Sequence, residues 1–76
     1  MKKIKLIWDF KGLEATKTAE HFHVHLKEFL IKEKIIDFTS ELEEVDEFYT
    51  MVNLIIDQKY VERIKNALKP KKAYFV

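Results

Sequence analysis

Two histidines on one predicted helix have the residue type and spacing for metal chemistry. His21 and His25 are four residues apart, which places two imidazoles on the same side of an α-helix, as in the metal-binding helix of zinc proteases. The sequence therefore predicts His21 and His25 as ligands of a zinc or nickel ion. Phe22 stands where that motif carries its catalytic glutamate, so protease-like hydrolysis is not expected.

A third ligand for such an ion is not evident in the sequence. Glu28 continues the side of the helix that carries His25, but it lies about 10 Å along the axis from His21 at 1.5 Å per residue, too far to share the metal. A third ligand would have to come from a loop or a second subunit. The alternative is that both histidines are solvated side chains on a polar flank, with His23 on the opposite flank.

The same imidazoles titrate near neutral pH, so they also suit a general base or an anion-binding group. Asp9 is the nearest acid in the predicted fold that could orient such a base, and a turn or capping role is its alternative. No pattern reaches the specificity of a catalytic signature. The sequence therefore favours a protein that is not an enzyme and leaves its biochemical activity unidentified.

The helix that carries the histidines is predicted from Leu13 to Lys34. Apolar residues recur along it at spacings of three and four, which gathers them into one buried stripe. The stripe consists of Ala15, Ala19, Phe22, Leu26, Phe29 and Leu30. Glu14 in the first turn and Lys34 in the last suit the helix dipole.

Alternating apolar and polar residues predict strands at 2–10, 35–42 and 48–56, with a short terminal strand at 72–76. Ile36 and Phe48 are expected on the helix-facing side of their strands. Asp57 is expected to cap a second helix that runs to about Leu68 and is stopped by Pro70. The order β-α-β-β-α-β predicts one α+β domain over residues 1–76, a ferredoxin-like sandwich whose antiparallel sheet has strand order 4-1-3-2 and both helices on one face.

Such a sandwich leaves one sheet face without helices, and that face is predicted to be apolar. The residues expected side by side on it are Ile7, Tyr49, Met51 and Ile55, with Tyr74 or Phe75 beside them. Contiguous apolar patches usually mark interaction surfaces. We therefore expect a self-associating module, a homodimer formed through this face or an edge strand. A heteromeric partner, or a few tolerated apolar residues, are the alternatives for this face.

A second hypothesis, from another functional class, is a metal-binding or small-ligand site on the His21 and His25 side of the helix. Such a site could be catalytic, and a neighbouring subunit would complete it.

Composition narrows the function classes further. The formal charge is +1 and 47% of the residues are hydrophobic, so neither disorder nor a broad field for nucleic acid is expected. There is no cysteine, which excludes disulfides and thiolate ligands. No apolar run approaches the roughly 20 residues of a membrane-spanning helix, and we expect a cytoplasmic protein without a membrane partner.

Residues 7–12 (IWDFKG), 18–21 (TAEH) and 25–29 (HLKEF) carry a family resemblance. They are similar to segments of small uncharacterised bacterial proteins with a ferredoxin-like fold. The resemblance covers the first half of the chain. It implies the same fold and a cytoplasmic location, and it implies no activity.

Overall fold

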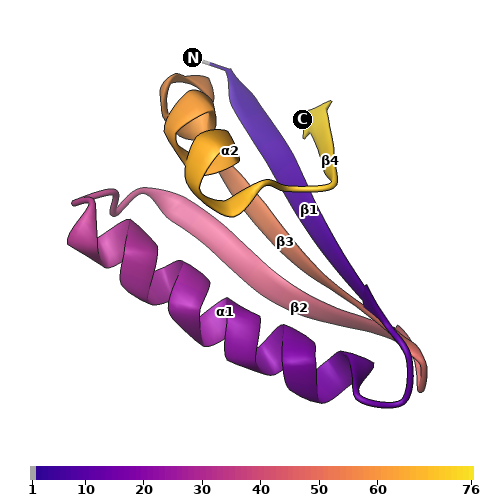
Figure 1. The fold of residues 1–76 in the computed structure, drawn as a ribbon. Coiled ribbons are helices and arrows are strands. Elements are labelled where there is room, and N and C mark those ends of the chain that lie inside the picture. The colour runs from indigo at the N-terminus through magenta and orange to yellow at the C-terminus, as the bar shows by residue number, and fades with distance from the viewer. Residues whose placement is uncertain (1) are drawn as a thin grey trace.

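A computed structural model describes residues 2–76. Along the chain its elements are β1 (Lys3–Lys11), α1 (Ala15–Lys32), β2 (Phe38–Asp46), β3 (Tyr49–Asp57), the 3₁₀ turn η1 (Gln58–Tyr60), α2 (Val61–Leu68) and β4 (Lys72–Phe75). The chain is thus α+β with four strands and two α-helices, as the sequence predicts (Figure 1).

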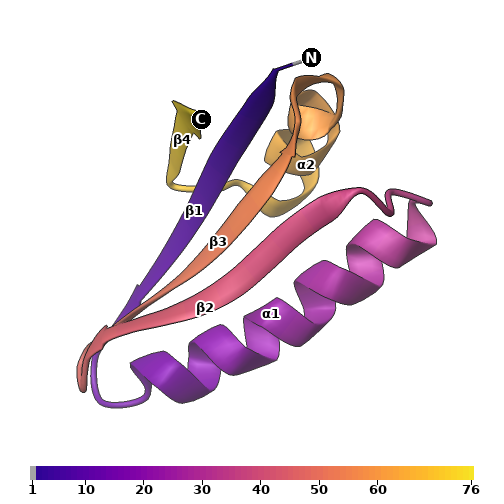
Figure 2. The ribbon, with the colours of Figure 1, turned by 180° about the vertical axis from the view of Figure 1, so that it is seen from behind.

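The four strands form one antiparallel sheet in the order β2-β3-β1-β4, which is 4-1-3-2 counted from the β4 edge. The two central strands, β1 and β3, pair along their whole length. The edge strand β4 is much shorter and pairs only with the part of β1 from Ile4 to Ile7. The other half of β1 therefore has a neighbour on one side only (Figure 2).

The core lies between the sheet and the two helices. Even-numbered residues of β1 and β3, including Leu6 and Leu54, pack with Leu26 and Leu30 of α1 and Ile64 of α2, and all five side chains are 0% exposed. Because contacts from both helices reach the same alternating set of strand residues, both helices cover one face of the sheet (Figure 1). Full burial of each such side chain contributes about 1.5–3 kcal/mol.

Three local features fix the ends of these elements. Gly12 adopts φ 114° in the turn after β1, and its N–H donates to the Phe48 carbonyl at 2.9 Å, a conformation open to glycine but strained for other residues. Lys69 takes the left-handed conformation that ends α2 just before Pro70. The indole Nε1 of Trp8 donates to the Leu68 carbonyl at 2.9 Å, which ties the end of α2 to the sheet.

The predicted inward position of Ile36 is wrong. Ile36 is 85% exposed, and its neighbour Ile35 is the buried residue at 1%. Lys34 has a positive φ of 61°, so the chain reverses after α1 and the Ile35 N–H donates to the Leu30 carbonyl at 2.9 Å. Ile35 thus closes the helix end, and the alternation of β2 begins only at Phe38.

Phe48 also differs from its predicted inward position, because it is 48% exposed in the turn between β2 and β3. Its N–H donates to the Asp46 carboxylate at 2.7 Å, and the inward alternation of β3 begins with the buried Thr50. The register shifts between Glu44 and Asp46, so the hairpin formed by β2 and β3 has an irregularity beside its turn.

No helix within residues 2–76 combines the length and apolar character needed to cross a bilayer.

Candidate functional site

The sheet face opposite the helices, called the open face below, carries the odd-numbered residues of β1 and β3. The strand register arranges its centre in three rows. Asn53 pairs with Ile7 in the middle row, Met51 pairs with Asp9 in one flanking row, and Ile55 pairs with Lys5 in the other. Apart from the Asn53 amide, the centre of the face is therefore apolar along β3 and at Ile7, with one cation and one anion on β1.

All four predicted contact residues lie on this face, since Ile7, Tyr49, Met51 and Ile55 occupy odd positions of the two central strands. Ile7 is only 8% exposed although no helix covers it, and the other three side chains are partly buried. Lys72 and Tyr74 of β4 pair with Ile7 and Lys5, so they belong to the same face; Phe75 pairs with Ile4 on the opposite one. The structure thus selects Tyr74 over Phe75 as the additional aromatic residue.

Asn53 is a functional candidate that the sequence reasoning missed. Its side chain is 2% exposed, and Nδ2 donates to Glu43 Oε1 at 3.0 Å. Its Oδ1 is buried and has no hydrogen-bond partner among residues 2–76, a state that costs about 1–3 kcal/mol. The signal in the sequence was an asparagine among the apolar residues of a predicted central strand.

Charged groups surround the centre in a definite order. On β1, Lys5 and Asp9 flank Ile7, and both are partly buried. The Tyr49 hydroxyl donates to Asp9 Oδ2 at 3.4 Å. Farther out, Glu41 on β2 and Lys72 on β4 are exposed at opposite edges of the middle row. Lys5 and Asp9 matter most for recognition of a partner, because charges that are partly shielded from solvent interact more strongly than exposed ones.

The histidine pair on α1 forms a second candidate site, on the helix that covers the other side of the sheet. The Nε2 atoms of His21 and His25 lie 3.0 Å apart, and the ring centroids lie 4.5 Å apart. His25 Nδ1 lies 3.0 Å from Glu28 Oε1. The structure therefore joins the two predicted ligands, with Glu28 next to His25 and not between the two rings.

His23 is separate from this pair. Its Nε2 lies 3.0 Å from Ser40 Oγ on β2. Burial, and secondarily the positive charge of Lys27, lowers the pKa of His23 below the ordinary value of 6.5. A neutral imidazole bonded to Ser40 is consistent with a structural role between α1 and β2.

The structure does not bring Asp9 to the histidines. Asp9 lies on the open face and contacts Tyr49, whereas α1 packs on the opposite face of the sheet. The hypothesis that Asp9 orients a histidine base is therefore wrong. Among residues 2–76, no group of three or more potential ligands is arranged to hold a metal ion.

No protein-family model, curated protein or solved structure matches the chain. The described residues enclose no detectable pocket. Both candidate sites are therefore surfaces, and their interpretation rests on their own geometry.

Proposed function

We propose that this protein is a ferredoxin-like interaction module that forms a homodimer through its open face. The observation that carries the proposal is the Asn53 amide, which is buried at the centre of that face with its Oδ1 unpartnered. Buried polar atoms normally have a partner. A second chain packed on the open face would supply that partner and cover the apolar residues around it.

The residue pattern makes the face complementary to a second copy of itself. A two-fold axis along the Asn53–Ile7 row exchanges the two flanking rows. Met51 of one chain then meets Ile55 of the other, and Asp9 meets Lys5. Both pairings occur twice in a symmetric dimer, so two apolar contacts and two ion pairs form around the centre.

The Asn53 side chains meet on the same axis. Nδ2 uses one N–H for Glu43, and an amide nitrogen has two. Because Oδ1 is buried within the single chain, the neighbouring side chains that cover it must move aside on association. The remaining N–H of each Asn53 then donates to the Oδ1 of the partner's Asn53, in a reciprocal pair. This contact removes the unsatisfied acceptor from both chains.

A two-fold axis along the strands is less favourable. It places β3 of one chain over β1 of the other, so Met51 lies against Asp9 and Ile55 against Lys5. Burying charges against apolar side chains costs several kcal/mol each. The preferred axis brings the two Glu41 side chains closer together at one edge and the two Lys72 side chains at the other. All four are exposed at the rim, where charge interactions amount to less than about 1 kcal/mol.

The short edge strand also fits this arrangement. Tyr74 of β4 flanks the Lys5 row and is 51% exposed, and β4 does not extend beside the Asp9 row. The axis that exchanges these rows places Tyr74 of one chain over the half of β1 that β4 leaves uncovered in the other. An exposed aromatic residue thus lies beside the part of β1 that has no neighbouring strand on that side.

Charge reversal tests this dimer. In Asp9→Lys both flanking rows of β1 carry a cation, and in Lys5→Asp both carry an anion, so like charges face each other in a dimer of either variant. Each variant alone should therefore be monomeric at concentrations where the wild type is dimeric. An equimolar mixture should form a heterodimer, because every cation then faces an anion. Sedimentation velocity of the separate and mixed variants measures both results.

The matched control is Lys72→Asp, which reverses an exposed charge at the rim of the same face and should weaken the dimer by less than about fivefold. The proposal is contradicted if the mixture stays monomeric while the variants remain folded by circular dichroism. Dimers of either single variant with wild-type affinity would contradict it as well.

A further inference from the structure

We infer that His21 and His25 bind one divalent transition-metal ion, zinc or nickel, through their Nε2 atoms, with Glu28 as the residue that orients His25. This site lies on α1 and is independent of the open face. Residues 2–76 place no third ligand beside the pair, so this two-histidine site replaces the three-ligand site expected from the sequence, and water completes the coordination. The inference rests on the spacing of the two nitrogens and on the contact of His25 with Glu28.

The spacing of the nitrogens matches two ligands on one ion. Metal–nitrogen bonds to histidine are about 2.0–2.1 Å long, so two such nitrogens lie about 3 Å apart when the angle at the metal is near 90°. They lie about 3.3–3.4 Å apart when the angle is tetrahedral. The observed Nε2–Nε2 distance of 3.0 Å is close to these values. The helix therefore already holds the two nitrogens at a separation suited to one ion, and rotation of the side chains must turn both Nε2 lone pairs toward it.

Glu28 fixes the form of His25 that a metal needs. With Nδ1–H donating to the Glu28 carboxylate at 3.0 Å, the proton of a neutral ring is on Nδ1 and the lone pair is on Nε2. Carboxylates that hold metal-binding histidines in this way raise the basicity of the ligand nitrogen. Glu28 is thus a positioning residue outside the coordination sphere.

The metal replaces the proton that otherwise joins the two rings. Without metal, His21 Nε2–H donates to the lone pair of His25 Nε2, which accounts for their 3.0 Å contact. With metal, His21 carries its proton on Nδ1, through exchange with solvent, and both Nε2 lone pairs bind the ion. Two neutral imidazoles are then the ligands, so protonation of either ring competes with the metal.

His23 provides the internal control. It lies on the same helix, two residues from each proposed ligand, but its Nε2 contacts Ser40 Oγ on β2 at 3.0 Å. Its ring therefore packs toward the sheet while the pair is exposed to solvent. Removing His23 changes the histidine content by the same amount as removing a ligand and leaves the proposed site intact.

Calorimetric titration of the whole chain with Ni²⁺ or Zn²⁺ alone tests the site. His21→Gln and His25→Gln should each weaken binding at least tenfold, and His23→Gln should change it less than twofold. Glu28→Gln should weaken binding by about tenfold, the lower end for residues that orient a ligand. Histidine side-chain NMR on the wild type should show Nε2 resonances of His21 and His25 shifting together.

The inference is overturned if His23→Gln weakens binding as much as His21→Gln, or if the double variant His21→Gln/His25→Gln binds as tightly as the wild type. Repeating the titration on a Met51→Asp chain separates this site from the proposed dimer, because Met51 lies on the opposite face of the sheet. Retained binding by a monomeric Met51→Asp chain supports a site within one α1 helix, and loss of binding by that folded chain overturns it.

Discussion

The two faces of the sheet are built from alternating residues of the same strands, but they differ in what covers their side chains and in whether their buried polar atoms have hydrogen-bond partners. On the covered face, Leu6, Leu54 and Ile56 are 0% exposed and pack against the helices. On the open face, Ile7 and Asn53 are nearly as buried, yet only neighbouring sheet side chains shield them. A low exposed fraction alone therefore does not distinguish a helix-covered core from a surface that binds a partner.

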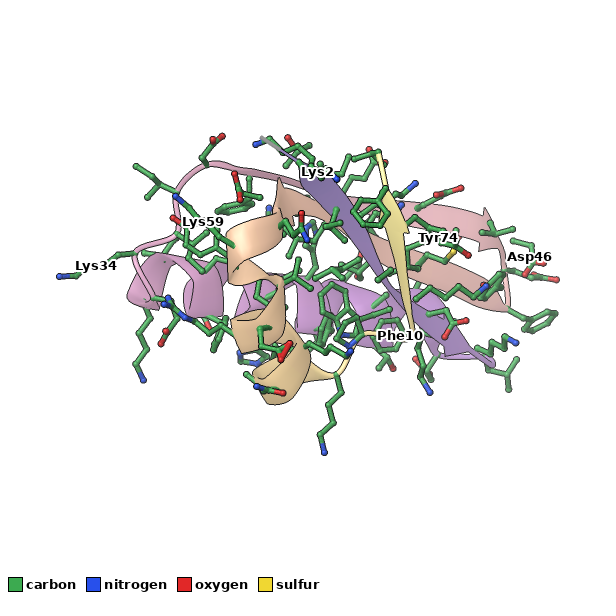
Figure 3. All side chains as sticks on the ribbon, turned by 90° about the horizontal axis from the view of Figure 1, so that it is seen from above. Lys2, Phe10, Lys34, Asp46, Lys59 and Tyr74 are labelled. Atoms are coloured by element: carbon green, nitrogen blue, oxygen red, sulfur yellow. The ribbon has the colours of Figure 1, made fainter. Side chains whose placement is uncertain are left out.

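The polar groups make the same distinction. Trp8 on the covered face donates its indole hydrogen to the Leu68 carbonyl, and the buried Thr50 hydroxyl lies 2.8 Å from that of Thr16. Asn53 Oδ1 on the open face has no such partner. A side chain removed from the covered face should thus reduce folding stability, whereas one removed from the open face should mainly reduce association. Figure 3 shows the side chains on the ribbon, with Tyr74 on the edge strand β4.

The largest effect should come from Leu54→Ala compared with Ile55→Ala. These neighbours point to opposite faces, and only Leu54 is part of the helix-covered core. Leu54→Ala should lower the free energy of unfolding by about 2–5 kcal/mol through lost burial and a cavity. Ile55→Ala should lower it by less than about 1 kcal/mol in urea unfolding at protein concentrations where the chain is monomeric. Equal losses would remove the proposed difference between the faces.

Next in size is Met51→Asp, which places a charge opposite Ile55 of the second chain. Since the contact occurs twice, the dimer should weaken at least about 100-fold, or 2.7 kcal/mol. Met51→Leu, which conserves volume and polarity, is the control and should dimerise nearly as well as the wild type. Sedimentation equilibrium gives both constants, and similar dimer constants for the two variants would show that Met51 is outside the contact.

A smaller effect is expected for Trp8→Phe on the covered face. The substitution keeps an aromatic ring beside Phe22, whose ring centroid lies 5.1 Å from that of Trp8, but it removes the donor to the Leu68 carbonyl. The free energy of unfolding should fall by about 1–2 kcal/mol, and amide exchange should accelerate most at the end of α2. Unchanged exchange there would show that the indole bond does not hold α2 on the sheet.

The smallest effect concerns pH. The pKa of His23 is lowered from 6.5 by burial, and further by Lys27, so the unfolded chain takes up this proton first as the pH falls. The contribution of neutral His23 is complete above pH 6.5 and is lost as the pH falls from there through the folded-state pKa. Urea unfolding between pH 5 and 8 should show a shallower dependence for His23→Gln. An identical dependence for wild type and variant would contradict a partly buried neutral ring.

Much of the fold follows from alternation in the sequence. The apolar positions of β1 and β3, the helical stripe of α1 and the stop at Pro70 each depend on local periodicity or backbone chemistry, and these predictions agree with the structure. Ile36 and Phe48 were misplaced for a different reason. The positive φ of Lys34 and the turn before Tyr49 are set by how the chain reverses direction, and a residue pattern does not specify that geometry.

The sequence predicts some residues of each candidate site but not all of their contacts. Helical spacing was enough to pair His21 with His25, but the contact of His25 with Glu28 depends on side-chain rotamers. On the open face, Ile7 and Met51 followed from strand alternation. The roles of Asn53, Lys5 and Asp9 did not, because they depend on the register that places Asn53 opposite Ile7 and sets the two charges in the flanking rows.

The most direct test of the open face as a dimer interface is sedimentation equilibrium of the wild-type chain over a range of concentrations, combined with side-chain NMR of Asn53. Because this side chain is already 2% exposed and bonded to Glu43 in a single chain, we predict a reversible monomer–dimer equilibrium in which its amide resonances shift as Oδ1 gains a donor. A chain that stays monomeric at millimolar concentration, or a dimer that leaves the Asn53 amide unchanged, would contradict the account.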